Sequence, residues 1–162
     1  KLSRHNVNLT DDVFVAGFPR SLNTTVKVTK GVVSSLAGSN DNLSQFQLDA
    51  AINSGSSGGP IFDKSGNVLG VVVGAKLSQL TRNDLVKLSR GERILFETTQ
   101  NQNYGIKSSL VMSLLESTGV IPAMPNTRKI SKQELREVIN NATYELNCWA
   151  LGKRLKMAQK RD

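Results

Sequence analysis

The residues best suited to chemistry in this chain are the serines and glycines at positions 53–60, Asn-Ser-Gly-Ser-Ser-Gly-Gly-Pro. A serine hydroxyl is a weak nucleophile, so it must be presented to a base and must face donors that stabilise the negative oxygen formed on attack. The chain has a single histidine, His5, far upstream of the stretch. The sequence therefore raises two questions, which serine would react and which group would serve as its base.

Three local interpretations of this stretch compete. A flexible Gly/Ser turn fits the composition, but the stretch is short and leads directly into Pro60 and an apolar run, which favours an ordered loop. Gly55-x-Ser57-x-Gly59 fits the nucleophile elbow of α/β-hydrolases, which needs a helix after the serine and a histidine downstream. Both are lacking here. A phosphate-binding loop needs a terminal Gly-Lys-Ser/Thr and a following helix, which are also absent.

The elements around the stretch are mostly short apolar segments rich in Val, Ile, Phe and Thr, bounded by Gly, Pro, Asn and Ser, which predict strands. Closely spaced short strands of this kind predict an all-β fold, a small six-stranded antiparallel barrel or a sandwich. A hairpin with a glycine turn is expected at 63–67. The strands are predicted at Val13–Phe18, Val26–Leu36, Gln45–Asp49, Pro60–Asp63, Asn67–Gly74 and Tyr104–Lys107.

Helices are predicted in three places. A polar insertion from Lys76 to Gln102 contains a short helical pattern at Thr81–Arg90, and a short helix at Ser108–Thr118 follows the last strand and stops at Gly119. Two prolines at 122 and 125 mark a linker. Beyond it, a capping box and an apolar stripe predict a basic amphipathic helix to about Lys160, packed on the same protein. The predicted domains are a barrel at 1–120, a linker at 121–130 and this helix at 131–162.

Composition limits the classes of function. The 162 residues carry a net charge of +8, with 38% apolar and 21% charged residues, as in a soluble globular domain. Basic residues concentrate after Asn126, but without interleaved aromatic residues, so we predict a solvated helix face and no nucleic-acid partner. No segment is long and apolar enough for a transmembrane helix. No metal or cofactor motif occurs, and none is predicted.

Residues 48–60 resemble the nucleophile region of trypsin-like serine proteases, and of their HtrA (Deg) branch in particular. Gly55-Ser56-Ser57-Gly58-Gly59-Pro60 is similar to the signature Gly-Asn/Asp-Ser-Gly-Gly-Pro, with Ser56 in place of Asn or Asp. The resemblance continues in chain order through about 105 residues. Its other segments are Val15–Pro19, Thr29–Leu36, Leu48–Asn53, Asn67–Val71 and Tyr104–Ser108.

The resemblance implies that the fold is the second barrel of a chymotrypsin-like protease and that Ser57 is the nucleophile. The amides of Gly55 and Ser57 would form the oxyanion hole, and Gly58 and Gly59 would keep bulk away from the incoming peptide. Ala51, Ile52 and Asn53 would form one wall of the specificity pocket, Val73, Gly74 and Ala75 the strand that pairs with substrate, and Tyr104 and Gly105 the back. Ala51 at the pocket base implies a small to medium, apolar residue before the cut bond.

The resemblance also implies that the histidine and aspartate lie on an N-terminal barrel, upstream of Lys1 or on a separate chain. His5 matches the connection between barrels, and Asp11 and Asp12 match the entry to the first matched strand. A lysine base such as Lys107 is an alternative that nothing local favours. We therefore expect a serine endopeptidase acting on polypeptides, inactive as this segment alone, or a non-catalytic peptide-binding or scaffold domain. An extracytoplasmic location, periplasmic or secreted, is implied by the family, and a homo-oligomer is left open.

Overall fold

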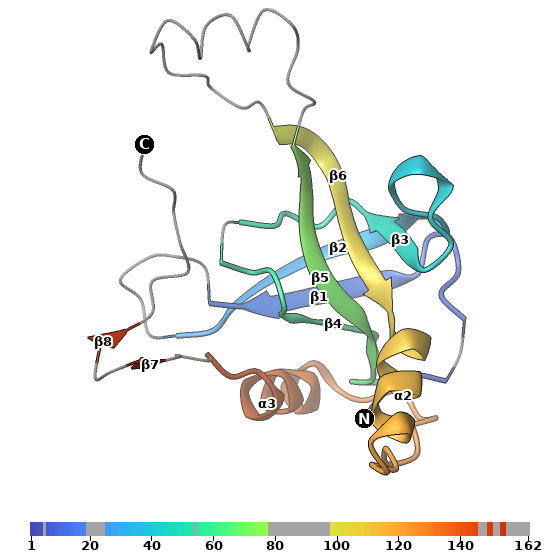
Figure 1. Ribbon diagram of the computed structural model, residues 1–162. Coiled ribbons are helices and arrows are strands. Elements are labelled where there is room, and N and C mark those ends of the chain that lie inside the picture. The colour runs from blue at the N-terminus through green and yellow to red at the C-terminus, as the bar shows by residue number, and fades with distance from the viewer. Residues whose placement is uncertain are drawn as a thin grey trace, which may run out of the picture.

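Six antiparallel strands close into a barrel in a computed structural model that describes residues 1–4, 6–18, 25–53, 55–77, 98–145, 149–150 and 153–154 (Figure 1). The strands follow the order β1-β2-β3-β6-β5-β4, with β4 pairing back onto β1. The predicted barrel is confirmed. The strands are β1 Asp12–Gly17, β2 Lys27–Ser35, β3 Gln45–Leu48, β4 Pro60–Phe62, β5 Val68–Leu77 and β6 Thr98–Lys107.

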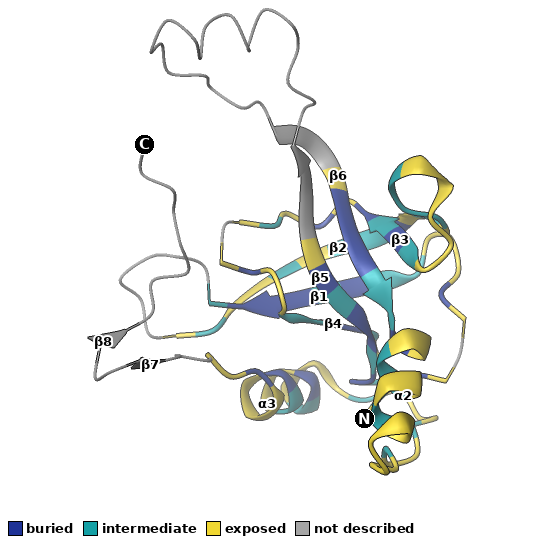
Figure 2. Cartoon of the chain, in the orientation of Figure 1, coloured by how far each residue is buried: buried dark blue, intermediate teal, exposed yellow. Residues whose placement is uncertain are grey.

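The barrel core consists of the inward-facing positions of these strands (Figure 2). Side chains alternate between the two faces of a strand, so β1 sends Val13 and Val15 inward and β3 sends Phe46 and Leu48 inward, all of them buried. The Phe46 ring occupies space that side chains at Gly70 and Gly105 would otherwise take, because a methyl group at either glycine would collide with it. Apolar alternation in the sequence therefore encodes the core directly.

The hairpin of β5 and β6 is longer than the sequence predicted and rises above the rest of the barrel (Figure 1). Its pairing continues to Leu77↔Thr98, whereas the expected strands ended at Gly74 and began at Tyr104. The extra residues include Gln100, Asn101 and Gln102, which are poor strand formers by composition, and cross-strand pairing outweighs that local preference. The helix expected at Thr81–Arg90 lies outside the described residues.

The helix after the last strand, α2 Ser108–Ser117, forms as predicted, with Gly119 at a φ of 77° just beyond its end. It lies beside the N-terminal segment, because the Ser108 hydroxyl donates to the Ser3 carbonyl at 2.9 Å. Its apolar stripe is only partly covered by the described residues, since Leu110 is 46% exposed and Leu114 66%. None of the helices in the described part of the chain is long and apolar enough to cross a bilayer.

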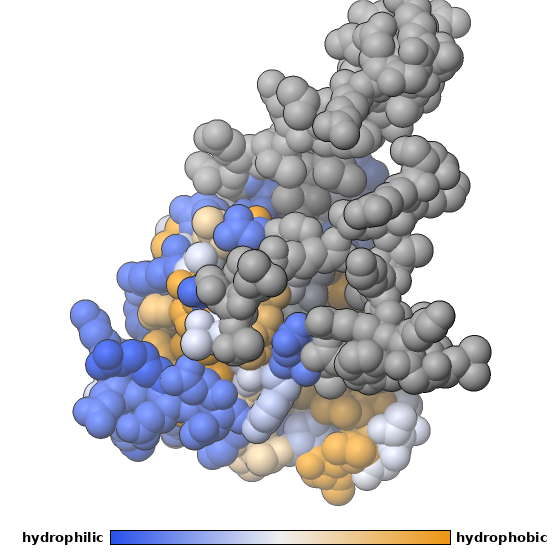
Figure 3. All heavy atoms as spheres, turned by 90° about the vertical axis from the view of Figure 1, so that its left-hand side faces the viewer, coloured by the Kyte–Doolittle hydropathy of each residue, from blue (hydrophilic) through white to orange (hydrophobic). Residues whose placement is uncertain are grey.

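The helix α3 Lys132–Ala142 packs on the outside of the barrel, as the sequence predicted. Leu135 and Ile139 are buried against Ala16 of β1 and Phe62 of β4. The preceding linker is held by Asn67, whose side chain donates to the Asn126 carbonyl at 2.9 Å and accepts from the Asn126 amide at 2.7 Å. The surface in Figure 3 is hydrophilic over much of its lower left, with a smaller apolar group at the lower right.

The predicted extent of this helix is wrong. It ends at Ala142, and Thr143 is already extended, whereas the sequence prediction reached about Lys160. Two asparagines, Asn140 and Asn141, form the last turn, and asparagine is a weak helix former. Further along, β7 Trp149–Ala150 and β8 Lys153–Arg154 form a short antiparallel pair, so the apolar periodicity of this segment does not correspond to one continuous helix.

The first turn of α3 carries a carboxylate whose pKa is strongly lowered. Glu134 accepts from Arg128 Nη2 at 2.6 Å and from the Ser131 amide at 2.8 Å. These hydrogen bonds, that of Arg128 above all, lower the pKa of Glu134 from 4.5 to about 2. Because the folded pKa lies below the unfolded one, the stabilisation is present above pH 4.5 and is lost as the pH falls toward 2.

Replacing Glu134 with glutamine is therefore expected to lower the thermal unfolding midpoint at pH 7 and to change it little at pH 2. The effect should shrink in high salt, because the pair is exposed and screened. Thermal scans of both proteins between pH 7 and pH 2 measure it. Glu137→Gln, on the same helix, is the control. A difference in unfolding midpoint between wild type and Glu134→Gln that stays constant from pH 7 to pH 2 would show that the ionised carboxylate contributes nothing to stability.

Candidate active site

The loop at 53–60, in which Ser54 lies outside the described residues, is held in place by backbone hydrogen bonds. The Ser56 amide donates to the Asn53 carbonyl at 2.9 Å, and Gly58 N donates to Val72 O at 2.8 Å. In return, Val72 N donates to Gly59 O at 2.9 Å. The loop is therefore tied to β5, in agreement with the expectation of an ordered stretch.

Two glycines turn this loop, and a third lets it approach the barrel closely. Gly55 and Gly58 have φ values of 100° and 85°, a region that glycine adopts without steric cost. A methyl group at Gly58 would face open space. One at Gly59 would not, because it would collide with the carbonyl of Ala16 on β1. The role first assigned to Gly59 is therefore wrong, and its small size serves packing of the loop.

Ser57 is exposed, and its hydroxyl donates to the Val73 carbonyl at 3.3 Å. The amides of Ser56, Gly58 and Gly59 all donate to backbone carbonyls. Within the described residues, by contrast, the amides of Gly55 and Ser57 have no acceptor. The loop thus places an exposed hydroxyl next to two backbone donors that remain available to an incoming atom.

The described residues bring no general base to Ser57. The chain's one histidine, His5, lies outside them. Asp12 instead bridges Lys30 at 3.0 Å and Lys64 at 3.2 Å, and these hydrogen bonds, that of Lys30 first, lower its pKa. Asp11 accepts from the Asn8 amide at 2.9 Å. Both aspartates therefore stabilise local structure, so a base for Ser57 must be sought outside the described residues.

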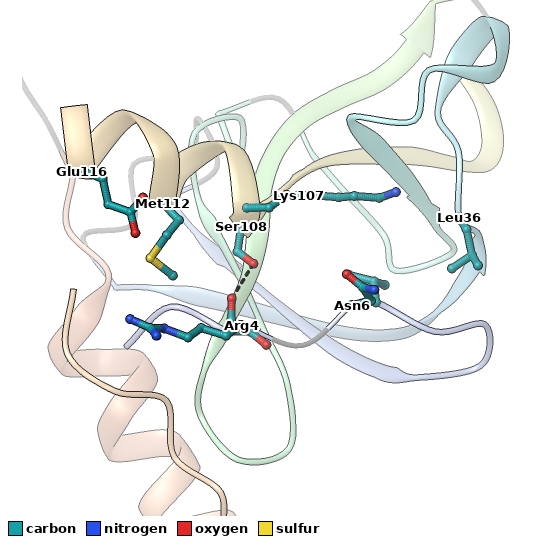
Figure 4. Close-up of a pocket in the computed structure, with 10 residues that line it drawn as sticks. Arg4, Asn6, Leu36, Lys107, Ser108, Met112 and Glu116 are labelled. Atoms are coloured by element: carbon teal, nitrogen blue, oxygen red, sulfur yellow. Dashed lines mark hydrogen bonds between the residues drawn. The ribbon is translucent and has the colours of Figure 1, made fainter. Parts of the chain in front are cut away.

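The lysine considered as an alternative base, Lys107, lines a different hollow. Figure 4 shows this pocket of about 500 Å³ between the N-terminal segment and α2, with Lys107 and Arg4 in its wall. None of the residues predicted for catalysis or substrate binding lines it. The described residues also contain no cluster of three or more metal-ligating side chains.

The segment expected to form a pocket wall, Ala51, Ile52 and Asn53, follows β3 and is bonded to β2. Its position is held by side chains that sequence reasoning did not identify. Thr29 Oγ1 donates to the Ala51 carbonyl at 2.7 Å, and buried Asn103 donates its Nδ2 to the Ala50 carbonyl at 2.7 Å. Asp49 Oδ1 accepts from the amide of Val32 at 2.6 Å. Ile52 packs against the core.

The residues expected at the opposite side of the pocket are neighbours in the sheet. Gly74 pairs with Tyr104 and Val72 with Gly105, and the exposed Val73 lies between Val72 and Gly74. Ala75 pairs with Asn103 of β6. Gly105 itself lies over Ile61 and Phe46 in the core. The sheet therefore places the predicted substrate-pairing strand beside the residues predicted for the back of the pocket. The one sequence feature that could have identified Asn103 was a polar side chain at an inward-facing position of the strand.

The barrel and the Gly-x-Ser-Gly-Gly loop tied to β5 agree with the resemblance of residues 48–60 to trypsin-like peptidases. Residues 2–71 match the family model of the trypsin-like peptidase domain. Over these residues the chain is similar to trypsin-like peptidases, and proteases of the HtrA type are among its relatives.

Individual relatives agree with this assignment. The chain is 31% identical over 148 residues to the uncharacterized protein y4bJ of Sinorhizobium fredii, covering 90% of this chain and 22% of that protein. It is 43% identical over 84 residues to Protease Do-like 2, chloroplastic, of Arabidopsis thaliana, covering 49% and 14%. A probable periplasmic serine endoprotease, DegP-like, of Brucella suis is 43% identical over 72 residues, covering 41% and 13%. The chain thus spans less than a quarter of each relative's length.

A solved structure agrees at the level of the fold. The serine endoprotease from Yersinia pestis superimposes with a TM-score of 0.50 at 24% identity, over 72% of this chain and 34% of that one. The closed barrel is thus shared with a protease, and the residues of the active site must be argued from their own geometry.

Proposed function

We propose that this chain carries the nucleophile of an HtrA-like serine endopeptidase that cuts polypeptides through an acyl-enzyme on Ser57. The observation that carries the proposal is the loop geometry, an exposed Ser57 hydroxyl beside the amides of Gly55 and Ser57, which have no acceptor among the residues that the structure describes. The similarity of residues 2–71 to the trypsin-like peptidase domain supports the reaction type.

In the proposed reaction, the Ser57 hydroxyl attacks the carbonyl carbon of the substrate and loses its proton to a base. The amides of Gly55 and Ser57 donate to the resulting oxyanion, each contributing a factor of roughly 10² to 10³ in rate. Collapse of this intermediate breaks the C–N bond, and the proton returns to the leaving amine. Water then hydrolyses the ester, which regenerates Ser57 and releases the acid.

The base and its aspartate partner are proposed to come from an N-terminal barrel, on the same longer chain or on a separate one. The described residues support this, because Asp11 and Asp12 are engaged elsewhere and Lys107 lines a different pocket. The names of two relatives, one chloroplastic and one periplasmic, support a site of action outside the cytoplasm.

A substrate chain is proposed to lie along Val73, Gly74 and Ala75 and to add a strand to the sheet. On the side of β5 that faces β4, the pairing ends at Val71↔Pro60. At Val72 the Ser57 loop replaces β4 as the hydrogen-bonding partner of β5, through backbone bonds of Val72 with Gly58 and Gly59. Beyond Val73 that side of β5 has no strand partner among the described residues, so a peptide placed there would run past Ser57.

Labelling with a fluorophosphonate tests the proposal, since this probe phosphonylates only an activated serine and releases fluoride. In the longer protein that contains this chain, mass spectrometry is expected to find the adduct on Ser57. It should be absent from Ser57→Ala and unchanged in Ser34→Ala, a matched exposed serine on β2.

The same experiment separates the alternative. A folded longer protein in which Ser57 stays unlabelled would overturn the enzyme and favour a non-catalytic peptide-binding domain. Labelling of this 162-residue chain alone at the full rate would instead contradict the assignment of the base to a further barrel.

A further inference from the structure

The end of β1 packs backbone to backbone against the loop that carries Ser57. A methyl group at Gly59 would collide with the Ala16 carbonyl, and one at Gly17 would lie 3.1 Å from the Cα atom of Ser56. Contacts as close as these have no flexible side chain between them that could absorb a displacement. A shift of β1 at Ala16 and Gly17 is therefore expected to move the loop.

Strand pairing holds this end of β1 on one side only. Toward β2, the pairing continues to Gly17↔Lys27. Toward β4, the pairing of the described residues stops at Val15↔Ile61. A strand that is paired along one edge has fewer hydrogen bonds to fix its backbone. The packing of the Ala16 side chain therefore helps to set the position of the strand end.

The helix α3 supplies that packing. Val13 and Val15 of β1 face the barrel interior, so Ala16 faces outward, yet its exposure is 0%. Ala16 and Phe62 of β4 belong to a cluster separate from the barrel interior, whose other buried members are Leu135 and Ile139 of α3. These two residues are four positions apart and lie on the same face of the helix. Figure 1 shows α3 alongside β1 and β4.

The helix is fixed to the barrel at a second place, the turn between β4 and β5. The side chain of Asn126 donates to the Ser65 carbonyl at 3.1 Å. A methyl group at Gly66 would lie 3.0 Å from Ile130 Cδ1 and 3.3 Å from Val138 Cγ1. We therefore expect α3, this turn and the outer face of β1 and β4 to form one packed unit.

We propose that Leu135 and Ile139 are positioning residues for the reaction, because their packing on Ala16 and Phe62 fixes where the loop holds the Ser57 hydroxyl. They act through the two strands that border the loop and are not assigned any contact with substrate. The inference rests on the proposed function and extends it to a helix that follows the barrel.

The test measures kcat, KM and stability in the longer protein. Leu135→Ala is expected to lower kcat about ten- to hundredfold, as a small misplacement of a reacting group does. KM should change little, because the substrate strand proposed at Val73–Ala75 pairs with β6 and not with β1. Fluorophosphonate labelling of Ser57 should slow by a similar factor, at a temperature where denaturant unfolding shows the variant to be folded.

Two further variants separate positioning from a general loss of packing. Leu135→Met keeps the volume and the apolar contact, so it should restore kcat. Ile139→Val removes a single methyl group and should lower kcat in the same direction by a smaller factor. It tests the inference on a folded protein if Leu135→Ala does not fold.

Val33→Ala is the control. Val33 is buried in the barrel interior and pairs with Leu48, toward the end of β2 opposite to the residue that pairs with Gly17. It should lower stability and leave kcat nearly unchanged. A wild-type kcat in folded Leu135→Ala and Ile139→Val, or an equal fall of kcat in Val33→Ala, would overturn the inference while the peptidase stands. A wild type that cuts no peptide and stays unlabelled at Ser57 would instead overturn the proposed function.

Discussion

Replacing Ser57 with alanine is expected to lower the turnover of the longer protein on peptides by on the order of 10⁶, as removal of a triad nucleophile does in the subtilisin example. No acyl-enzyme can form without the hydroxyl. The fold should be unaffected, because Ser57 is exposed and its hydroxyl makes one hydrogen bond of 3.3 Å. Initial rates with a peptide substrate and thermal unfolding of both proteins measure the two quantities.

Ser34→Ala, also an exposed serine in the barrel, is the control and should keep full turnover. The size of the loss is informative, because removal of an oxyanion donor costs only about 10² to 10³, whereas removal of the nucleophile costs far more. A Ser57→Ala protein that retained more than about one hundredth of the turnover would place the nucleophile elsewhere.

Local sequence patterns predicted the parts of this fold that local physics controls. The six strands follow from alternating apolar residues, and the first turn of α3 follows from the capping box of Ser131 and Glu134. The turn at Gly66, with a φ of 74°, follows from the need for a left-handed residue in the hairpin. In each case the residues that decide the structure lie within a few positions of one another.

The features that were missed depend on partners distant in sequence. Asn103 meets the Ala50 carbonyl across 53 residues, and Thr29 meets that of Ala51 across 22. Gly59 needs its small size because of the Ala16 carbonyl on another strand. No local pattern carries such information. The loop motif therefore predicted Ser57 as the candidate nucleophile, whereas the groups that hold the proposed pocket required the three-dimensional structure.

The bounds of the β5–β6 hairpin and of α3 differ from the predicted bounds for different reasons. Gln100 and Asn101 are poor strand formers, but their backbones join the antiparallel pairing that continues to Leu77↔Thr98. Beyond Ala142, helical spacing of apolar residues continues in the sequence, and Trp149 and Ala150 nevertheless pair as a strand. In the β5–β6 hairpin, cross-strand pairing outweighs propensities of a few tenths of a kcal/mol per residue. The helix α3, by contrast, ends at the weak helix formers Asn140 and Asn141.

Replacing Phe46 with alanine is expected to lower the free energy of unfolding of this chain by about 3 to 5 kcal/mol. Phe46 is fully buried among Ile61, Gly70 and Gly105. The two glycines have no side chains that could move into the vacated space. The cavity should therefore persist, which places the cost toward the upper part of the range. Denaturant unfolding of the two proteins measures the difference.

Leu43→Ala is the matched control for Phe46→Ala, because Leu43 is a large apolar residue shortly before the same strand and is 75% exposed. Its effect should stay within about 0.5 kcal/mol.

Because the Phe46 side chain separates β3 from the β4 and β5 side of the barrel, its loss should also weaken the anchorage of the Ser57 loop at Val72. In the longer protein, Phe46→Ala is then expected to slow labelling of Ser57 even at temperatures where it remains folded. If Phe46→Ala lowered the free energy of unfolding by less than about 1 kcal/mol, the barrel interior would not be packed around Phe46.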